Sequence, residues 1–150
     1  MYKRILVPVD GSATSRRGLR AAIELAKSQR ARLVILNVVD AVPVFASLEG
    51  VVAYDPGILD ALKKGGQAIL ARAAAEAKKR GVQAKTVLAE NIAGRVADAI
   101  VRQARKQRAD LIVIGTHGRR GVSRMVMGSD AELVVRHTPV PVLLVRAPGK

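Results

Sequence analysis

The sequence contains no cysteine and no tryptophan, and aromatic residues make up only 2% of it. The absence of cysteine excludes disulfides and thiolate metal sites, and it fits a reducing compartment. No apolar run approaches the ~20 residues that a membrane-spanning helix needs. The first apolar run ends before Asp10 and is too short for a signal peptide. We therefore expect a cytoplasmic protein without a membrane segment.

Acidic residues are also scarce, since 12 Asp and Glu stand against 26 Lys and Arg and give a net charge of +14. Such a surplus predicts attraction to nucleotides, nucleic acids or other polyanions. The basic clusters 27–32, 76–81 and 102–108 are spread along the chain, and few aromatic side chains are present to stack on bases. This pattern argues against specific nucleic-acid recognition. Non-specific, salt-sensitive binding stays open.

A hydrophobic fraction of 49% over 150 residues predicts one globular domain, residues 1–150, with a core of Val, Ile, Leu and Ala. Nearly continuous apolar runs predict strands that are buried on both faces of a parallel sheet. These runs are Arg4 to Val9, Arg32 to Val39, Asp110 to Gly115 and Val140 to Val145. A weaker run, 82–89, alternates between apolar and polar residues and suits a more exposed strand.

Helical spacing of apolar residues fills the segments between these runs. The predicted helices are Ser15 to Arg30, Ile58 to Arg80, Ile92 to Gln107 and Asp130 to His137. The order β-α-β-α-β-α-β-α-β predicts an α/β fold: a single open, parallel, five-stranded sheet with right-handed crossovers and helices on both faces. The long link from Asp40 to Gly57 is either a binding loop or a solvated excursion.

The stretch "GTHGRRGVSRMVMGS", residues 115–129, follows a predicted buried strand and precedes a predicted helix. Its glycines at 115, 118 and 128 would let backbone N–H groups approach an anion closely. Ser129 then opens a helix, whose N-terminus favours phosphate. In a parallel sheet, ligands bind at the carboxyl ends of strands, where the strand order reverses. The loop therefore predicts an anion site at that edge.

The loop is neither of the two common phosphate loops, because "GxxxxGK[ST]" is absent and "GxGxxG" does not follow the first strand. The spacing Gly115-x2-Gly118-x9-Gly128-Ser129 instead resembles the nucleotide-binding signature of the universal stress protein family, in its ATP-binding branch. The resemblance extends over almost the whole chain, through "ILVPVDGS", "LNVVD", "DLIVIGTHGRRG" and "MGSDAELVVRHTPVPVLLVR".

The resemblance implies a Rossmann-like fold of the adenine nucleotide alpha hydrolase type that binds ATP, with Mg²⁺, across the strand ends. It implies that Asp10 accepts hydrogen bonds from the ribose and that the backbone of Val38 contacts adenine. The adenine wall would be Pro8, Val9 and Ile114, and the phosphate cradle would be Gly115, His117, Gly118, Arg119, Gly128 and Ser129. Asp130 departs from the family pattern, which often has a small or apolar residue after this serine. An acid beside a triphosphate repels it unless a metal ion bridges them or the side chain turns away.

Structural explanations compete with two of these assignments. Ser129 and Glu132 form an S-x-x-E pattern, which predicts a capping box whether or not phosphate binds. Asp10 precedes Gly11 in a pair typical of turns. At a strand end facing a phosphate loop, we favour the ribose contact for Asp10.

The resemblance further implies a homodimer in which the C-terminal strands, residues 140–146, pair with each other. The leading hypothesis is thus a homodimeric, nucleotide-dependent regulator or sensor in stress response that is not an efficient enzyme and whose protein partner is not specified. The first alternative is a slow ATPase or phosphotransferase that uses Asp10 or Asp130 on a metal. The second is a basic module that binds anionic polymers without a nucleotide.

Overall fold

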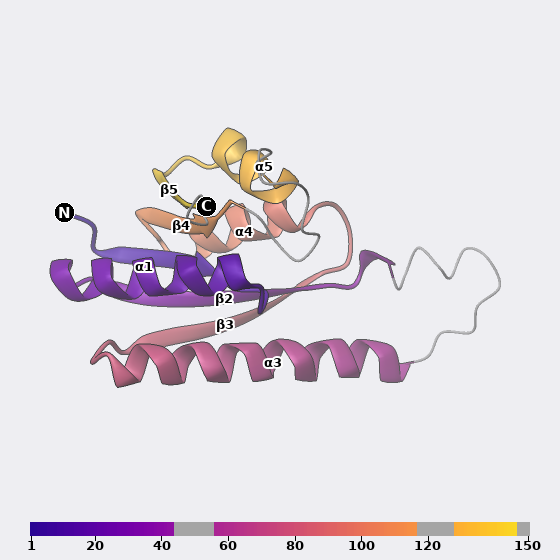
Figure 1. Cartoon of the computed structure of the whole chain (residues 1–150). Helices are drawn as coiled ribbons and strands as arrows, with labels where there is room; N and C mark the ends of the chain where they lie inside the picture. Colours follow the sequence, from indigo (N-terminus) through magenta and orange to yellow (C-terminus); the bar gives the residue numbers. More distant parts are fainter. Residues whose placement is uncertain (44–55, 117–127, 147–150) are drawn as a thin grey trace.

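The computed structural model describes residues 1–43, 56–116 and 128–146, and these form a parallel sheet covered by helices (Figure 1). Its five strands are β1 (Arg4–Pro8), β2 (Arg32–Asp40), β3 (Ala84–Asn91), β4 (Leu111–Gly115) and β5 (Val142–Val145). The spatial order is β3-β2-β1-β4-β5, and every neighbouring pair is parallel. The predicted five-stranded parallel sheet is confirmed.

The helices are α1 (Ala13–Gln29), α3 (Pro56–Lys79), α4 (Val96–Lys106) and α5 (Ser129–His137). In Figure 1, α3 runs along one side of the sheet, while α4 and α5 lie on the other side. Alternate residues of the central strands separate the two cores: Ile5 and Val7 of β1 pack with α1 and α3, and Leu6 packs with α4 and α5. This alternation places helices on both faces, as the sequence predicts.

The two outermost strands are less buried than the central ones. In β3 only Ala89 and Asn91 are buried, which confirms the prediction of a more exposed strand, although the strand covers Ala84–Asn91 and not 82–89. In β5 the central Leu143 and Leu144 are exposed and the flanking valines are half-buried. β5 begins two residues later than predicted, after Pro141, whose nitrogen has no hydrogen to give to a ladder.

Helix α4 begins at Val96, not at Ile92 as predicted. Gly94 takes a left-handed φ of +83°, and the side-chain amide of Asn91 donates to the carbonyl of Gly94 at 3.3 Å. This turn uses residues 92–95 before the helix starts. Asp98 then accepts a hydrogen bond from the backbone N–H of Arg95, the N-cap.

Three helices end with the same motif at the amino edge of the sheet. A left-handed residue follows each of α1, α3 and α4, and the N–H of the residue after it donates to a carbonyl five residues earlier. The donating N–H groups belong to Ala31, Val82 and Ala109. The left-handed residue is Gly81 after α3, but Arg30 after α1 and Arg108 after α4. A side chain in this conformation costs ~1 kcal/mol, so only α3 has the residue that the backbone favours.

The same edge gathers basic side chains. Helices that connect parallel strands run back along the sheet, so their C-termini meet at the amino edge. Their last turns carry Lys27 in α1, Lys78 and Lys79 in α3, and Arg105 and Lys106 in α4. The basic clusters are therefore dispersed in the sequence but collected in the fold, which corrects the premise that they form no common surface.

Candidate functional site

The carboxyl ends of β1 and β4 lie side by side at the point where the strand order reverses. From β1 the chain proceeds to β2 and β3 on one side, and it returns to β4 and β5 on the other. Pro8 ends β1, and Gly115 ends β4. This is the switch point at which open α/β sheets bind ligands. The structure thus brings together the two strand ends that the sequence analysis selected.

The residues that the resemblance assigns to the adenine wall are non-polar and lie around this edge. Val9 and Ile114 are buried, and Pro8 is half-buried. Because Pro8 pairs with Leu36, β2 extends beyond the end of β1, and Val38 lies in that extension. Val38 is half-buried and packs against the core on the side of α4 and α5.

A hydrogen-bonded turn fixes Asp10 between β1 and α1. The Oδ1 atom of Asp10 accepts the backbone N–H of Ser12 at 2.9 Å, and the Ser12 hydroxyl caps α1 by accepting the N–H of Ser15 at 3.1 Å. The Ser15 hydroxyl closes the turn by accepting the N–H of Asp10 at 3.3 Å. Gly11 has a φ of +82°, which suits glycine. The turn role of Asp10 is confirmed, and it sets the position of the carboxylate at the switch point.

Gly115 is the point where α1 packs against β4. A Cβ on Gly115 would lie 2.8 Å from the carbonyl oxygen and Cγ2 of Thr14. Gly18, one turn further along α1, faces the same strand end. A Cβ on Gly18 would lie 3.3 Å from the backbone nitrogen of Gly115. The missing side chain of Gly115 therefore accommodates the helix, a packing role that the sequence analysis did not foresee.

Thr116 and Gly128 join the two ends of the glycine- and arginine-rich segment. The N–H of Gly128 donates to the carbonyl of Thr116 at 2.6 Å, and the N–H of Thr116 donates to the carbonyl of Val145 at 3.0 Å. This pairing sets the start of α5 beside the carboxyl end of β4. His117, Gly118 and Arg119 lie outside the described residues.

The N-terminus of α5 differs from the predicted capping box. Gly128 is the N-cap, Ser129 is the first helical residue, and the N-cap itself has no side chain with which to cap the helix. The prediction that Ser129 caps through an S-x-x-E pattern is wrong, because the N–H of Glu132 donates to the carbonyl of Gly128 at 3.0 Å and the helix therefore starts one residue earlier. Glu132 pairs instead with Arg136 at 2.9 Å. Since glycine has no side-chain acceptor, the first-turn N–H groups can serve an anion.

Ser129 and Asp130 are both exposed at this helix start. Asp130 and Glu132 make the first turn of α5 acidic, whereas the first turn of α1 carries no acid. The helix dipole favours these carboxylates, but they oppose a nearby phosphate. Within residues 1–43, 56–116 and 128–146, no three His, Cys, Asp or Glu side chains lie together as a metal site would require.

Two buried asparagines near the strand ends were missed by the sequence analysis as site-building residues. Asn37 is 5% exposed, and its amide donates to the carbonyl of Val9 at 2.7 Å, which ties β2 to the end of β1. Asn91 is 1% exposed, and its amide donates to Asp40 and to the carbonyl of Gly94. For Asn37 the available signal was an amide inside an otherwise apolar run, whereas Asn91 ends a mixed strand and gave no such signal.

None of the helices in the described part of the chain is long and apolar enough to cross a membrane.

Comparison with protein families matches residues 1–146 to the universal stress protein family. A universal stress protein of Bacillus subtilis is 38% identical over 151 residues, covering 97% of this chain and 100% of its own. One from Methanocaldococcus jannaschii is 37% identical over 150 residues, covering 100% of this chain and 85% of its own.

Solved structures of the family share this fold. A protein of the family from Burkholderia pseudomallei is 39% identical with a TM-score of 0.79, covering 97% of both chains. A universal stress protein in complex with cAMP is 27% identical with a TM-score of 0.71, covering 96% of this chain and 97% of its own. One from Archaeoglobus fulgidus in complex with dAMP is 23% identical, with a TM-score of 0.71 and coverages of 96% and 98%.

Proposed function

The chain belongs to the universal stress protein family, and we propose that it binds ATP with Mg²⁺ at the switch point as a regulator or sensor in stress response. One observation carries the proposal: Asp10 follows the end of β1, the strand that pairs with β4, and the end of β4 joins the start of α5 at its glycine N-cap. Similar proteins hold cAMP and dAMP, which supports an adenine nucleotide as the ligand.

In this proposal Asp10 accepts the ribose hydroxyls, and the adenine lies against Pro8, Val9, Ile114 and the backbone of Val38. The phosphates extend toward Gly115, Gly128 and Ser129, with His117, Gly118 and Arg119 completing the cradle from outside the described residues. The N–H groups of a helix start donate to phosphate oxygens, and the helix dipole adds a favourable field. The surplus of positive charge on the chain assists the approach of the anion.

In this proposal Mg²⁺ reduces the repulsion between an acidic side chain and the phosphates. Asp130 lies in the first turn of α5, so a bound triphosphate meets an acid there. Mg²⁺ takes oxygen ligands from phosphate, carboxylate and water, and it offsets the repulsion between Asp130 and the phosphates. ATP affinity should therefore depend on Mg²⁺ more than AMP affinity does.

The test is the nucleotide content and turnover of the purified protein. We expect ATP to be released on denaturation, or to rebind in calorimetry with higher affinity when Mg²⁺ is present, with phosphate release near the background rate. The glycine variant Gly118→Val should lose this binding. Absence of any adenine nucleotide binding at millimolar concentration would contradict the proposal. Phosphate release well above the Gly118→Val background would favour the slow ATPase.

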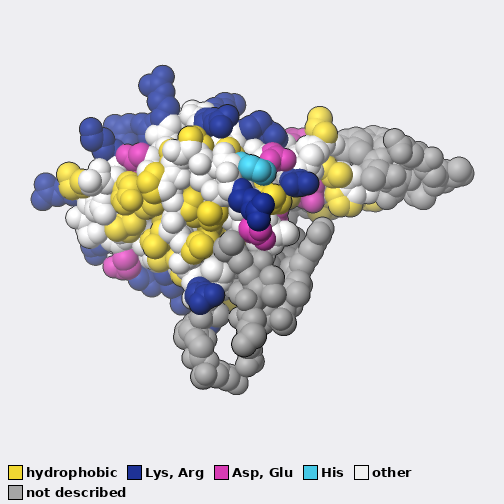
Figure 2. Space-filling view, turned by 90° about the horizontal axis from the view of Figure 1, so that it is seen from above, with side chains coloured by type: hydrophobic (Ala, Val, Ile, Leu, Met, Phe, Trp, Pro, Cys, Tyr) yellow, Lys and Arg dark blue, Asp and Glu magenta, His cyan; other side chains and the backbone are white. Residues whose placement is uncertain are grey.

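We also propose that the protein is a homodimer through β5. This strand is the last in the sheet order and pairs with β4 alone among the described strands. Leu143 and Leu144 on it are 41% and 37% exposed. In Figure 2, hydrophobic side chains gather on the face that carries β5 and α5, with basic side chains around them. An apolar strand edge of this kind is a liability unless a second chain covers it.

The variant Leu144→Asp should convert the dimer to a monomer, because it places a charge where a second copy would pack. Light scattering after gel filtration gives the mass directly. Leu62→Asp is the matched control, since Leu62 on α3 has the same exposed fraction, 37%. A monomeric wild type, or equal behaviour of the two variants, would show that β5 is not the interface.

A further inference from the structure

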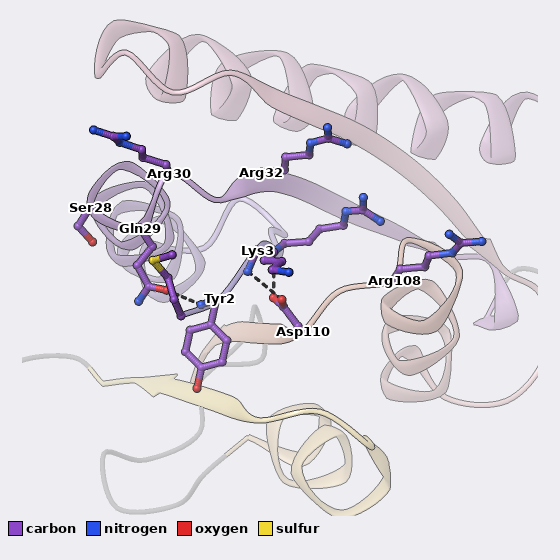
Figure 3. Close-up of a pocket in the computed structure, with 10 residues that line it drawn as sticks. Tyr2, Lys3, Ser28, Gln29, Arg30, Arg32, Arg108 and Asp110 are labelled. Carbon is purple, nitrogen blue, oxygen red and sulfur yellow. Dashed lines mark hydrogen bonds between the residues drawn. The ribbon is translucent and has the colours of Figure 1, made fainter.

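A second basic site lies at the amino edge of the sheet, at the opposite end of the strands from the switch point. It is a pocket of about 830 Å³, lined among others by Lys3 and Arg4 of the β1 start, Arg32 of the β2 start, and Arg30 and Arg108. This volume lies in the range of small-ligand sites. Figure 3 shows the labelled side chains of Lys3, Arg30, Arg32 and Arg108 arriving from separate elements around one opening.

Asp110 is the one acid that lines the pocket in the described part of the chain, and its carboxylate binds backbone N–H groups. Its Oδ2 atom accepts the N–H of Lys3 at 2.8 Å, and its Oδ1 atom accepts the N–H of Arg4 at 2.9 Å. Dashed lines mark hydrogen bonds to Asp110 in Figure 3. Within the described ranges, Lys3, Arg30, Arg32 and Arg108 form no ion pair with Asp or Glu. The pocket therefore holds an uncompensated positive charge.

Helix-end electrostatics do not by themselves require an arginine at positions 30 and 108. Cations in the last turn of a helix stabilise its dipole, and Lys27, Arg105 and Lys106 already occupy such positions. Arg30 is the C-cap of α1, Arg108 follows Gln107, the C-cap of α4, and both have a left-handed φ, of 55° and 53°. At the same position after α3 the chain has Gly81, which does not line the pocket. The two strained positions that carry arginine are those beside the pocket.

The arrangement of the charges indicates the form of the ligand. The labelled guanidinium groups of Arg30, Arg32 and Arg108 spread around the opening in Figure 3 and do not converge on one point. A single phosphate would reach few of them, whereas an extended anion with several charges can contact them together. Among the described residues that line the pocket, Tyr2 is the one aromatic, so successive bases would find little to stack on. These features favour a short phosphate chain over a nucleic acid.

We propose that this pocket binds an oligophosphate chain, through Lys3, Arg30, Arg32 and Arg108, independently of the nucleotide at the switch point. Arginine suits this role because its planar group donates several hydrogen bonds to phosphate oxygens. Arg4 has a supporting part, since its Nη1 donates to the carbonyl of Gln107 at 2.6 Å and so fixes the start of β1 against the end of α4.

The test titrates inorganic tripolyphosphate into the full chain and follows backbone amide shifts by NMR. The amides of Lys3, Arg30, Arg32 and Asp110 should move together, with one affinity. ATP should move them as well if the triphosphate is what the pocket recognises, and tripolyphosphate alone should move them if an inorganic chain is required. Either pattern supports the site. Shifts confined to Gly115, Gly128 and Ser129 would overturn it, while leaving the nucleotide proposal intact.

Substitution separates binding from folding. Arg30→Gly with Arg108→Gly removes two charges and gives both positions the residue that a left-handed backbone favours, so the variant should stay folded. Its dissociation constant for tripolyphosphate should rise at least tenfold. Arg72→Gln with Arg102→Gln removes two exposed charges from α3 and α4 outside the pocket and should change it less than twofold.

Two results would sink the proposal. Equal weakening by the two double variants would mean that diffuse charge attracts the anion and that no site exists. Tighter binding of a thymidine dodecamer at the same amides, with none of tripolyphosphate, would identify a nucleic-acid surface instead.

Discussion

Gly115→Ala should lose at least tenfold in ATP affinity and ~1–3 kcal/mol in the free energy of unfolding, the usual cost of forcing extra atoms into a packed contact. The added Cβ would lie 2.8 Å from the carbonyl oxygen of Thr14 and 3.0 Å from its carbonyl carbon. Backbone atoms cannot rotate away as a side chain can, so the start of α1 must shift from β4. The shift acts at the switch point, where Asp10 precedes the same helix.

The matched control is Gly65→Ala on α3, where an added Cβ meets nothing within 4 Å. This substitution should gain up to ~1 kcal/mol, because alanine has a higher helix propensity than glycine. Chemical denaturation gives both stabilities, and calorimetry with ATP gives both affinities. If Gly115→Ala binds ATP as tightly as Gly65→Ala does, the approach of α1 to β4 has no part in forming the site.

The sheet was predictable because its signal is local. Each buried strand reads as an apolar run, and alternating β and α segments leave few topologies. The switch point then follows from chain order, which is why Asp10 and Gly115 could be selected together. Boundaries were less accurate, as at α5, where Gly128 and not Ser129 is the N-cap and its N–H donates to Thr116, which is distant along the chain.

The role of Gly115 and the charge of the amino edge could not be read from composition. Gly115 was assigned to phosphate because glycine permits close approach, but what approaches it in the fold is Thr14. The basic clusters are far apart in sequence, and the parallel topology places the helix ends that carry them along one edge. Both features depend on which segments lie side by side in the fold, and a local stretch of sequence does not contain that information.

Asp10→Asn should weaken ATP binding roughly 10- to 100-fold, the range expected when a charge-assisted hydrogen bond of about 1.5–3 kcal/mol is lost. The carboxylate can accept from two ribose hydroxyls, whereas the amide replaces one acceptor by a donor. Asparagine keeps an oxygen for the N–H of Ser12, which Asp10 Oδ1 accepts at 2.9 Å. The turn into α1 should survive, and the unfolding free energy should stay close to that of the wild type.

A comparison of ATP with dATP tests whether the weaker ATP binding of Asp10→Asn comes from a lost ribose contact or from a changed turn. dATP lacks the 2′-hydroxyl, so it should bind the wild type about tenfold more weakly than ATP, the cost of one such bond. In Asp10→Asn the difference between ATP and dATP should shrink, because the partner of that hydroxyl has already been weakened. Calorimetry with both nucleotides and both proteins gives the four affinities that this comparison needs. An undiminished preference for ATP in the variant would place the ribose elsewhere and leave Asp10 with its turn alone.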